Sequence, residues 1–151
     1  MKLFLDTNVI LDVLADREPW AEDSATVVSL LEAEHIEGVV AAHTITTLHY
    51  LLEKYLGSRK ARAAVVDLLR LVSVAAVTGE SLLKALSLGW ADFEDAVQAV
   101  CAIDAEVDYM ITRNVGDYRG VSVPVLTPSD FLAVMRSAAE KPTRKPRRKR
   151  S

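Results

Sequence analysis

The stretch Lys2-Leu3-Phe4-Leu5-Asp6-Thr7-Asn8 decides how this chain folds. Apolar character over residues 2–5 ends abruptly at three polar residues that are good helix caps, which predicts a strand followed by a helix over residues 9–16. In parallel α/β sheets, functional side chains gather where a strand ends and the chain turns into a helix. Asp6 is therefore the first candidate site residue.

The same alternation of short apolar runs and helical patterns continues along the chain. We expect further strands at 38–41, 72–77, 108–112 and 124–126, and further helices at 19–35, 44–56, 58–70, 79–88, 92–105 and 128–139. The run at 72–77 is β-branched and continuous, which is typical of a buried strand. Alternating strands and helices predict an α/β fold with a parallel sheet covered by helices on both faces.

Length and composition favour one globular domain. The chain has 151 residues, of which 50% are hydrophobic and 26% charged. It can therefore bury one sizeable core, and its composition is not that of a disordered protein. The lone Cys101 cannot form an intramolecular disulfide, and no signal-peptide pattern precedes the first strand. The longest apolar stretches fall well short of the ~20 residues of a membrane-spanning helix. We therefore expect a cytoplasmic protein with no membrane partner.

The charge is unevenly distributed. Residues 141–151 hold seven basic residues and no acid, so the net charge of −3 divides into +7 there and 11 − 21 = −10 in the remainder. We expect a folded domain over residues 1–139 and a basic, disordered tail over 140–151. An acidic body repels nucleic acid unless cations neutralise its carboxylates or the tail binds the polyanion. A tail that only aids solubility is equally compatible with this composition.

Acidic residues stand at the expected strand ends. Asp6 follows the first strand, Asp117 lies in the turn after strand 108–112, and Asp92 and Asp95 open one helix three residues apart, hence on one face. Converging carboxylates raise one another's pKa unless a divalent cation neutralises them, and oxygen-only ligands suit Mg²⁺ or Mn²⁺. Each acid taken alone could be only a helix cap or a turn residue. Their joint placement favours a metal site.

These residues carry a family resemblance. The segments Leu5-Asp6-Thr7-Asn8-Val9 and Asp92-Phe93-Glu94-Asp95-Ala96, and Thr112-Arg113-Asn114 followed by Asp117-Tyr118, resemble the three acidic motifs of PIN-domain ribonucleases. The resemblance covers roughly residues 1–135. It implies a three-layer PIN-like fold, with a parallel sheet of four or five strands flanked by helices, and Mg²⁺- or Mn²⁺-dependent endoribonuclease activity on RNA. Many short prokaryotic members are toxins of VapBC toxin–antitoxin pairs, so a small antitoxin protein is an expected partner, and we also expect a homodimer.

The resemblance also assigns roles to single residues. Asp6, Asp95 and Asp117 match the family's catalytic, metal-binding acids, and Asp92 matches an accessory acid. The expected supporting residues are Asn8, Thr47, Thr112 and Asn114. Arg113, beside Thr112, is placed to act as a phosphate clamp or is a surface residue of the turn.

One position departs from the family pattern. The family usually has a Glu on the helix after the second strand, and Thr47 stands there in this chain. Since Mg²⁺ commonly keeps several waters, a Thr hydroxyl could hold a metal-bound water, and we expect activity with weaker metal affinity. The alternative is a PIN-fold module that binds RNA or protein with weakened or absent catalysis. A phosphotransfer domain fits less well, because Asn8 occupies the place of the second aspartate that haloacid-dehalogenase enzymes need.

Overall fold

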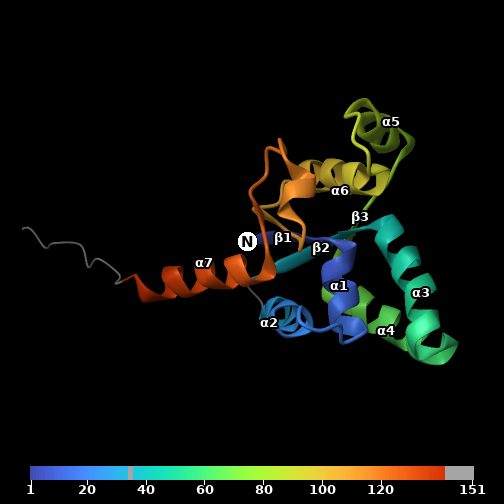
Figure 1. The fold of residues 1–151 in the computed structure, drawn as a ribbon, viewed down its shortest axis with the longest axis vertical. Coiled ribbons are helices and arrows are strands. Elements are labelled where there is room, and N and C mark those ends of the chain that lie inside the picture. The colour runs from blue at the N-terminus through green and yellow to red at the C-terminus, as the bar shows by residue number, and fades with distance from the viewer. Residues whose placement is uncertain (34–35, 142–151) are drawn as a thin grey trace, which may run out of the picture.

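Strands and helices alternate along the chain in the predicted order (Figure 1). The computed structural model describes residues 1–33 and 36–141. Its elements are β1 (Lys2–Leu5), α1 (Thr7–Leu14), α2 (Ala21–Glu32), β2 (Glu37–Ala41), α3 (Ala42–Leu56), α4 (Ser58–Leu71), β3 (Val72–Ala75), α5 (Gly79–Ser87), α6 (Phe93–Asp104), β4 (Tyr109–Ile111), the 3₁₀ helix η1 (Val115–Tyr118), β5 (Val125–Leu126) and α7 (Pro128–Glu140).

The described strands form one parallel sheet. Its five strands lie in the order β3-β2-β1-β4-β5, and every adjacent pair is parallel, which confirms the predicted sheet. β1 occupies the centre, and Leu3, Phe4 and Leu5 are fully buried. The residue that follows β1 therefore lies at the middle of the sheet's carboxyl edge, flanked by the ends of β2 and β4.

Helices cover both faces of the sheet, as predicted. One apolar core contains Leu3 and Leu5 with residues of α1, α2, α3, α4 and α7, and the other contains Phe4 with residues of α6 and Ala85 of α5. Successive strand residues point to opposite faces, which explains why β1 contributes to both cores. Figure 1 shows the resulting layers, with α5 and α6 on one side of the sheet and α1, α2 and α7 on the other.

The strand expected at 72–77 differs from its prediction. β3 ends at Ala75, and the prediction that it is buried is wrong, because Ser73 and Val74 are exposed. The physical reason is its place in the sheet: β3 pairs only with β2 and forms an edge. A continuous β-branched run shows strand propensity but does not show which strand is central.

Helix boundaries also shift by a few residues. α1 begins at Thr7, because Asp6 itself is the cap, its side chain accepting a hydrogen bond from the Asn8 backbone. α2 ends at Glu32, and its expected end near residue 35 lies outside the described residues. α7 runs to Glu140, while the basic segment 142–151 lies outside the described residues, so the expected tail stays a prediction.

Two further features concern packing and membranes. A Cβ at Gly38 would lie 2.7 Å from Leu31 Cδ1, so any larger residue there would require the Leu31 side chain, which packs α2 against β2, to shift. In the described part of the chain, no helix combines the length and apolar character needed to cross a membrane.

Candidate active site

The candidate site begins where β1 and β4 end side by side. Leu5 pairs with Ile111 in the sheet, so Asp6 and Thr112 leave adjacent strands next to each other. Thr112 Oγ1 donates a 2.7 Å hydrogen bond to Asp6 Oδ2, and both side chains are buried. These two strand ends thus lie side by side at the edge of the sheet where the acids are expected to gather.

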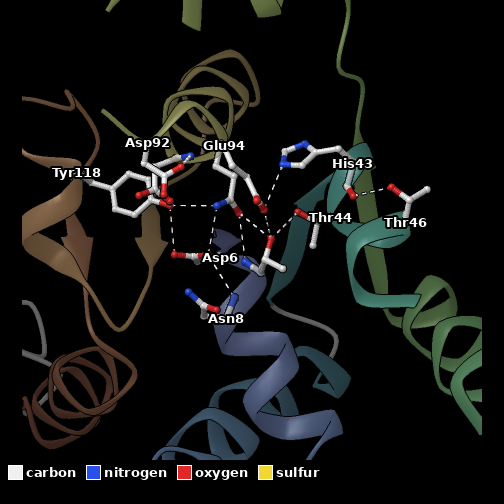
Figure 2. A network of polar contacts seen from close by, with 11 residues as sticks. Asp6, Asn8, His43, Thr44, Thr46, Asp92, Glu94 and Tyr118 are labelled. Atoms are coloured by element: carbon white, nitrogen blue, oxygen red, sulfur yellow. Dashed lines mark hydrogen bonds and ion pairs between the residues drawn. The ribbon is translucent and has the colours of Figure 1, made fainter. Parts of the chain in front are cut away.

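Asp6 is held by four hydrogen-bond donors (Figure 2). Oδ2 accepts from Thr112 Oγ1 and from the Tyr118 hydroxyl at 3.2 Å, while Oδ1 accepts from Gln98 Nε2 at 3.2 Å and from the Asn8 backbone N–H at 3.3 Å. Only 3% of the residue is exposed. Because a buried carboxylate needs such partners to stay charged, the site is built to keep Asp6 fixed in one orientation.

Tyr118 connects Asp6 to Asp95. Its hydroxyl donates to Asp95 Oδ1 at 3.0 Å and lies 3.2 Å from Asp6 Oδ2. Burial raises the pKa of Asp95 to about 6 against the Tyr118 hydrogen bond, which lowers it, and the charges of Asp92, Asp6 and Asp117 raise the pKa further. The charges of the three other acids therefore all act on Asp95.

Asp92 and Asp117 lie on the exposed side of this group. Asp92 caps α6 by accepting a hydrogen bond from the Asp95 backbone N–H at 3.1 Å, and Asp117 belongs to η1. Together with Asp95, Trp90 and Arg119 they line an open hollow of about 390 Å³. The structure therefore brings the four sequence-predicted acids together, with Asp6 buried behind the hollow.

The donor set fits a hard divalent cation held partly through water. The four acids offer oxygen atoms only, which suits Mg²⁺ or Mn²⁺. Burial and, to a smaller extent, the charges of the other three acids raise the pKa of Asp95, and a bound cation would offset both effects. Within residues 1–33 and 36–141, however, no three His, Cys, Asp or Glu side chains are close enough to form a ready-made metal cage. Mg²⁺ commonly binds through one or two carboxylates and several waters, and Asp6 and Asp95 meet that need.

The expected supporting residues differ in what they contribute. The backbone N–H of Asn114 donates to Thr112 Oγ1 at 3.2 Å, and Asn8 likewise contributes its backbone N–H to Asp6, so both act through the main chain. On α3, Thr44 is fully buried and its Oγ1 lies 3.0 Å from Thr7 Oγ1. Thr47, one turn further on, is half-buried and makes no side-chain hydrogen bond to the described part of the chain.

A second polar group adjoins the acids at Thr7. Thr7 Oγ1 donates to Glu94 Oε1 at 3.3 Å, and His43 Nε2 lies 3.7 Å from the same oxygen. The histidine lowers the pKa of Glu94, against the effect of burial. Figure 2 shows His43 pointing from the start of α3 toward Glu94. Sequence reasoning singled out none of these contacts.

Arg113 does not serve as the predicted phosphate clamp. Its Nε lies 2.9 Å from Asp12 Oδ2, its guanidinium stacks over the Trp20 ring at 3.9 Å, and its side chain is 15% exposed. Burial raises the pKa of Asp12, while Arg113 and Arg17 lower it. Arg113 is thus turned inward, where it ties the loop after β4 to α1 and α2.

The main site residue that sequence reasoning missed is Gln98. It is 1% exposed on α6 and bonds to Asp6, Thr7 and Tyr118. A signal existed: Gln98 is the one polar residue in the stretch 96–102, where every other residue is apolar. A buried amide on an apolar helix face requires hydrogen-bond partners. Here the partners are Asp6 itself, Thr7 beside it and Tyr118 beside Asp117.

The chain is similar to known proteins in sequence and in fold. A family model described as a PIN domain matches residues 2–116, a segment that includes Asp6, Asp92 and Asp95 and ends just before Asp117. Ribonuclease VapC1 of Aquifex aeolicus is 26% identical over 135 residues, covering 86% of this chain and 92% of that protein. Both matches cover most of the chain.

Solved structures share the fold at lower identity. VapBC2 from Rickettsia felis, bound to a DNA fragment from its promoter, matches with a TM-score of 0.67 and 14% identity, covering 84% of this chain and 98% of that one. VapC20 from Mycobacterium tuberculosis, a sarcin-ricin loop cleaving toxin, matches with a TM-score of 0.58 and 18% identity, covering 72% and 86%. At these identities the likeness shows the fold.

Proposed function

Since the chain belongs to the PIN-domain family, we propose that it is a metal-dependent endoribonuclease that hydrolyses RNA phosphodiester bonds. The observation that carries the proposal is the convergence of four acids at one open hollow, with Asp6 buried behind it; burial raises the pKa of Asp95 to about 6, and the charges of the other three acids add to the rise. Perturbed carboxylates in an open hollow are typical of catalytic sites. The similarity to a VapC ribonuclease supports the same reaction class.

PIN domains typically use divalent metal ions. In this chain Asp6 and Asp95 would hold Mg²⁺ or Mn²⁺ directly, with Asp92 and Asp117 acting through bound water. When bound, the ion would polarise the scissile phosphate and lower the pKa of an attacking water. Thr112, Gln98 and the Asn8 backbone keep Asp6 in place for this role.

The remaining residues indicate attack by water and not by a side chain. The hydroxyls of Thr7, Thr44 and Thr112 are buried and committed to hydrogen bonds, and Cys101 is buried in the core. Without a cation, the carboxylates lining the hollow repel a phosphate. Cleavage is therefore expected to depend on the metal at two steps, substrate binding and chemistry.

We further propose that the chain is the toxin of a type II toxin–antitoxin pair. Similar structures include VapBC from Salmonella typhimurium bound to DNA and a toxin–antitoxin complex from Klebsiella pneumoniae. A small protein encoded beside this chain should then bind it and suppress its activity. Co-expression and co-purification of the two products test this, and failure of the neighbouring product to bind would contradict it.

A second candidate is a PIN-fold module that binds RNA or protein without cleaving. Two observations favour it: Thr47 stands where the family usually has a Glu, and no three metal-binding side chains cluster within the described residues. It predicts RNA binding with no product formed at any metal concentration.

RNA cleavage with Mn²⁺, Mg²⁺ or EDTA separates the two candidates. The endoribonuclease cleaves with metal and stops in EDTA, and Asp6→Asn is the matched control, because Asn also caps helices and keeps the side-chain shape. We expect Asp6→Asn to fold normally and to lose cleavage. Undiminished cleavage in EDTA, or equal cleavage by the variant, would contradict the proposed mechanism, while metal binding without cleavage would indicate the second candidate.

A further inference from the structure

Gln98 is a buried amide surrounded by apolar neighbours. Val97, Ala99, Val100 and Cys101 on the same helix all belong to the core that includes Phe4, and Gln98 itself is 1% exposed. A buried amide without partners destabilises a fold, so its hydrogen bonds show what it is there to hold.

The hydrogen bonds of Gln98 fix its orientation. Oε1 accepts from the Thr7 backbone N–H at 3.2 Å and also lies 3.3 Å from Thr7 Oγ1, which shares its one proton between Gln98 and Glu94. Nε2 donates to Asp6 Oδ1 at 3.2 Å and to the Tyr118 hydroxyl at 3.1 Å. A flipped amide would set Oε1 against the Asp6 carboxylate and its NH₂ group against the Thr7 N–H, so only one orientation satisfies every group.

The hydrogen bond from Gln98 orients the hydroxyl of Tyr118. Its hydroxyl accepts from Gln98, so its single proton points to the acids, where Asp95 Oδ1 lies at 3.0 Å and Asp6 Oδ2 at 3.2 Å. The ring is held from another side by an edge-on contact with Trp90 at 6.0 Å between centroids. The hydroxyl therefore occupies the place between the two carboxylates.

Asp6 is left with no free acceptor site. A carboxylate offers about four lone-pair directions; Thr112, Gln98 and the Asn8 backbone N–H donate into three of them, and the Tyr118 hydroxyl, which shares its one proton with Asp95, stands at the fourth. Any cation that binds Asp6 must displace one of these donors. Tyr118 is the donor that also contacts Asp95, the second acid a cation would need.

We propose that Gln98 is a positioning residue that holds Asp6 for a divalent cation, and that the Tyr118 hydroxyl is the donor that gives up its place when the cation binds. The inference rests on the proposed metal-dependent function and adds to it two residues with opposite effects on metal affinity. Gln98 contacts Oδ1 and helps the site, whereas Tyr118 contacts Oδ2 and competes with the metal.

Mn²⁺ affinity of the purified full chain, measured by titration calorimetry, tests both roles. Gln98→Met, which keeps the length of the side chain but removes its donors, should weaken Mn²⁺ binding about tenfold or more. Tyr118→Phe, which keeps the ring, should tighten Mn²⁺ binding about threefold or more, because a competing hydrogen-bond donor is removed. A purely structural role for either residue predicts no such opposite changes.

Val97→Ala is the matched control, since it removes buried volume beside Gln98 on the same helix without touching a hydrogen bond. It should lower the melting temperature and leave Mn²⁺ affinity within about twofold. An unchanged affinity for Gln98→Met, or weaker binding by Tyr118→Phe, would overturn this inference alone. A wild-type chain that binds no Mn²⁺ would overturn the proposed function and this inference together.

Discussion

Asp95→Asn should stabilise the metal-free protein at neutral and alkaline pH. The carboxyl of Asp95 is partly buried among Asp92, Asp6 and Asp117, which is why its pKa is raised to about 6. Asn keeps an oxygen that can accept the Tyr118 hydrogen bond and has no charge to repel the other acids. The substitution thus removes the unfavourable electrostatic interaction and preserves the shape of the site.

The magnitude follows from the pKa. A rise from the ordinary 3.8 to about 6 corresponds to at most about 3 kcal/mol of unfolding free energy lost by the wild type once Asp95 ionises, and solvent screening reduces this figure because the carboxyl is only partly buried. Because the folded form holds its proton more tightly than the unfolded form, stability is fully present below pH 3.8 and is lost as pH rises through 6. The Asn variant should gain up to about 3 kcal/mol at pH 8 and about half of that at pH 5.

Thermal unfolding in EDTA across pH 4 to 8 is the assay. For a chain of this size, the expected gain at pH 8 is roughly 6–12 °C in melting temperature, shrinking toward zero at pH 4. Asp67→Asn, on the exposed face of α4, is the control and should show no such pH-dependent gain. Saturating Mn²⁺ should narrow or reverse the difference in melting temperature between the variant and the wild type, since Mn²⁺ stabilises the wild type by binding to it. The reasoning would be refuted if Asp95→Asn were less stable than the wild type at pH 8, or if its melting temperature were raised by the same amount at every pH.

The remaining predictions concern metal affinity, RNA capture and assembly. Thr47→Glu should tighten Mn²⁺ binding by restoring the family's usual ligand type, and unchanged affinity in calorimetry would show that residue 47 does not face the site. Removing residues 141–151 should flatten the salt dependence of RNA affinity in the Asp6→Asn background, by roughly 0.7 on a log–log plot for each phosphate that the tail neutralises, and equal slopes would assign capture to the folded body. The expected homodimer would best use the exposed leucines of α5, among which Leu83 is 70% exposed. Leu83→Glu should therefore yield monomers in sedimentation, and an unchanged sedimentation coefficient would place the interface elsewhere or exclude a dimer.

The acids could be predicted from sequence because strand ends anchor them. Asp6 follows β1 directly and Thr112 follows β4, so a parallel pairing of the two strands is enough to bring them together. The i,i+3 spacing of Asp92 and Asp95 needs only one helix. Such local rules do not give strand order, which explains why a run that predicts a buried strand forms the edge strand β3.

The residues that support the acids could not be predicted from sequence, because their contacts join positions far apart in the chain. Gln98 meets Asp6 across 92 positions of sequence, and Thr44 meets Thr7 across 37, so each contact requires the packed positions of two helices. An apolar helical pattern predicts only that residue 98 faces the core. The contact to Asp6 follows once α6 is placed over the end of β1.

Thr112 and Arg113 show how far adjacency in the chain can mislead. Successive residues at a strand end point in opposite directions, so Thr112 reaches Asp6, the cap of α1, while Arg113 reaches Asp12 within α1. Asp6 and Asp12 are six residues apart, at the cap and in the body of α1, and the loop after β4 is fastened to both. The inward turn of Arg113 therefore has a consequence for the site: it anchors the backbone from which Thr112 holds Asp6. Electrostatic recruitment of RNA must then come from the cation or from other basic residues, such as Arg119 in the wall of the hollow, because Arg113 is already paired with Asp12.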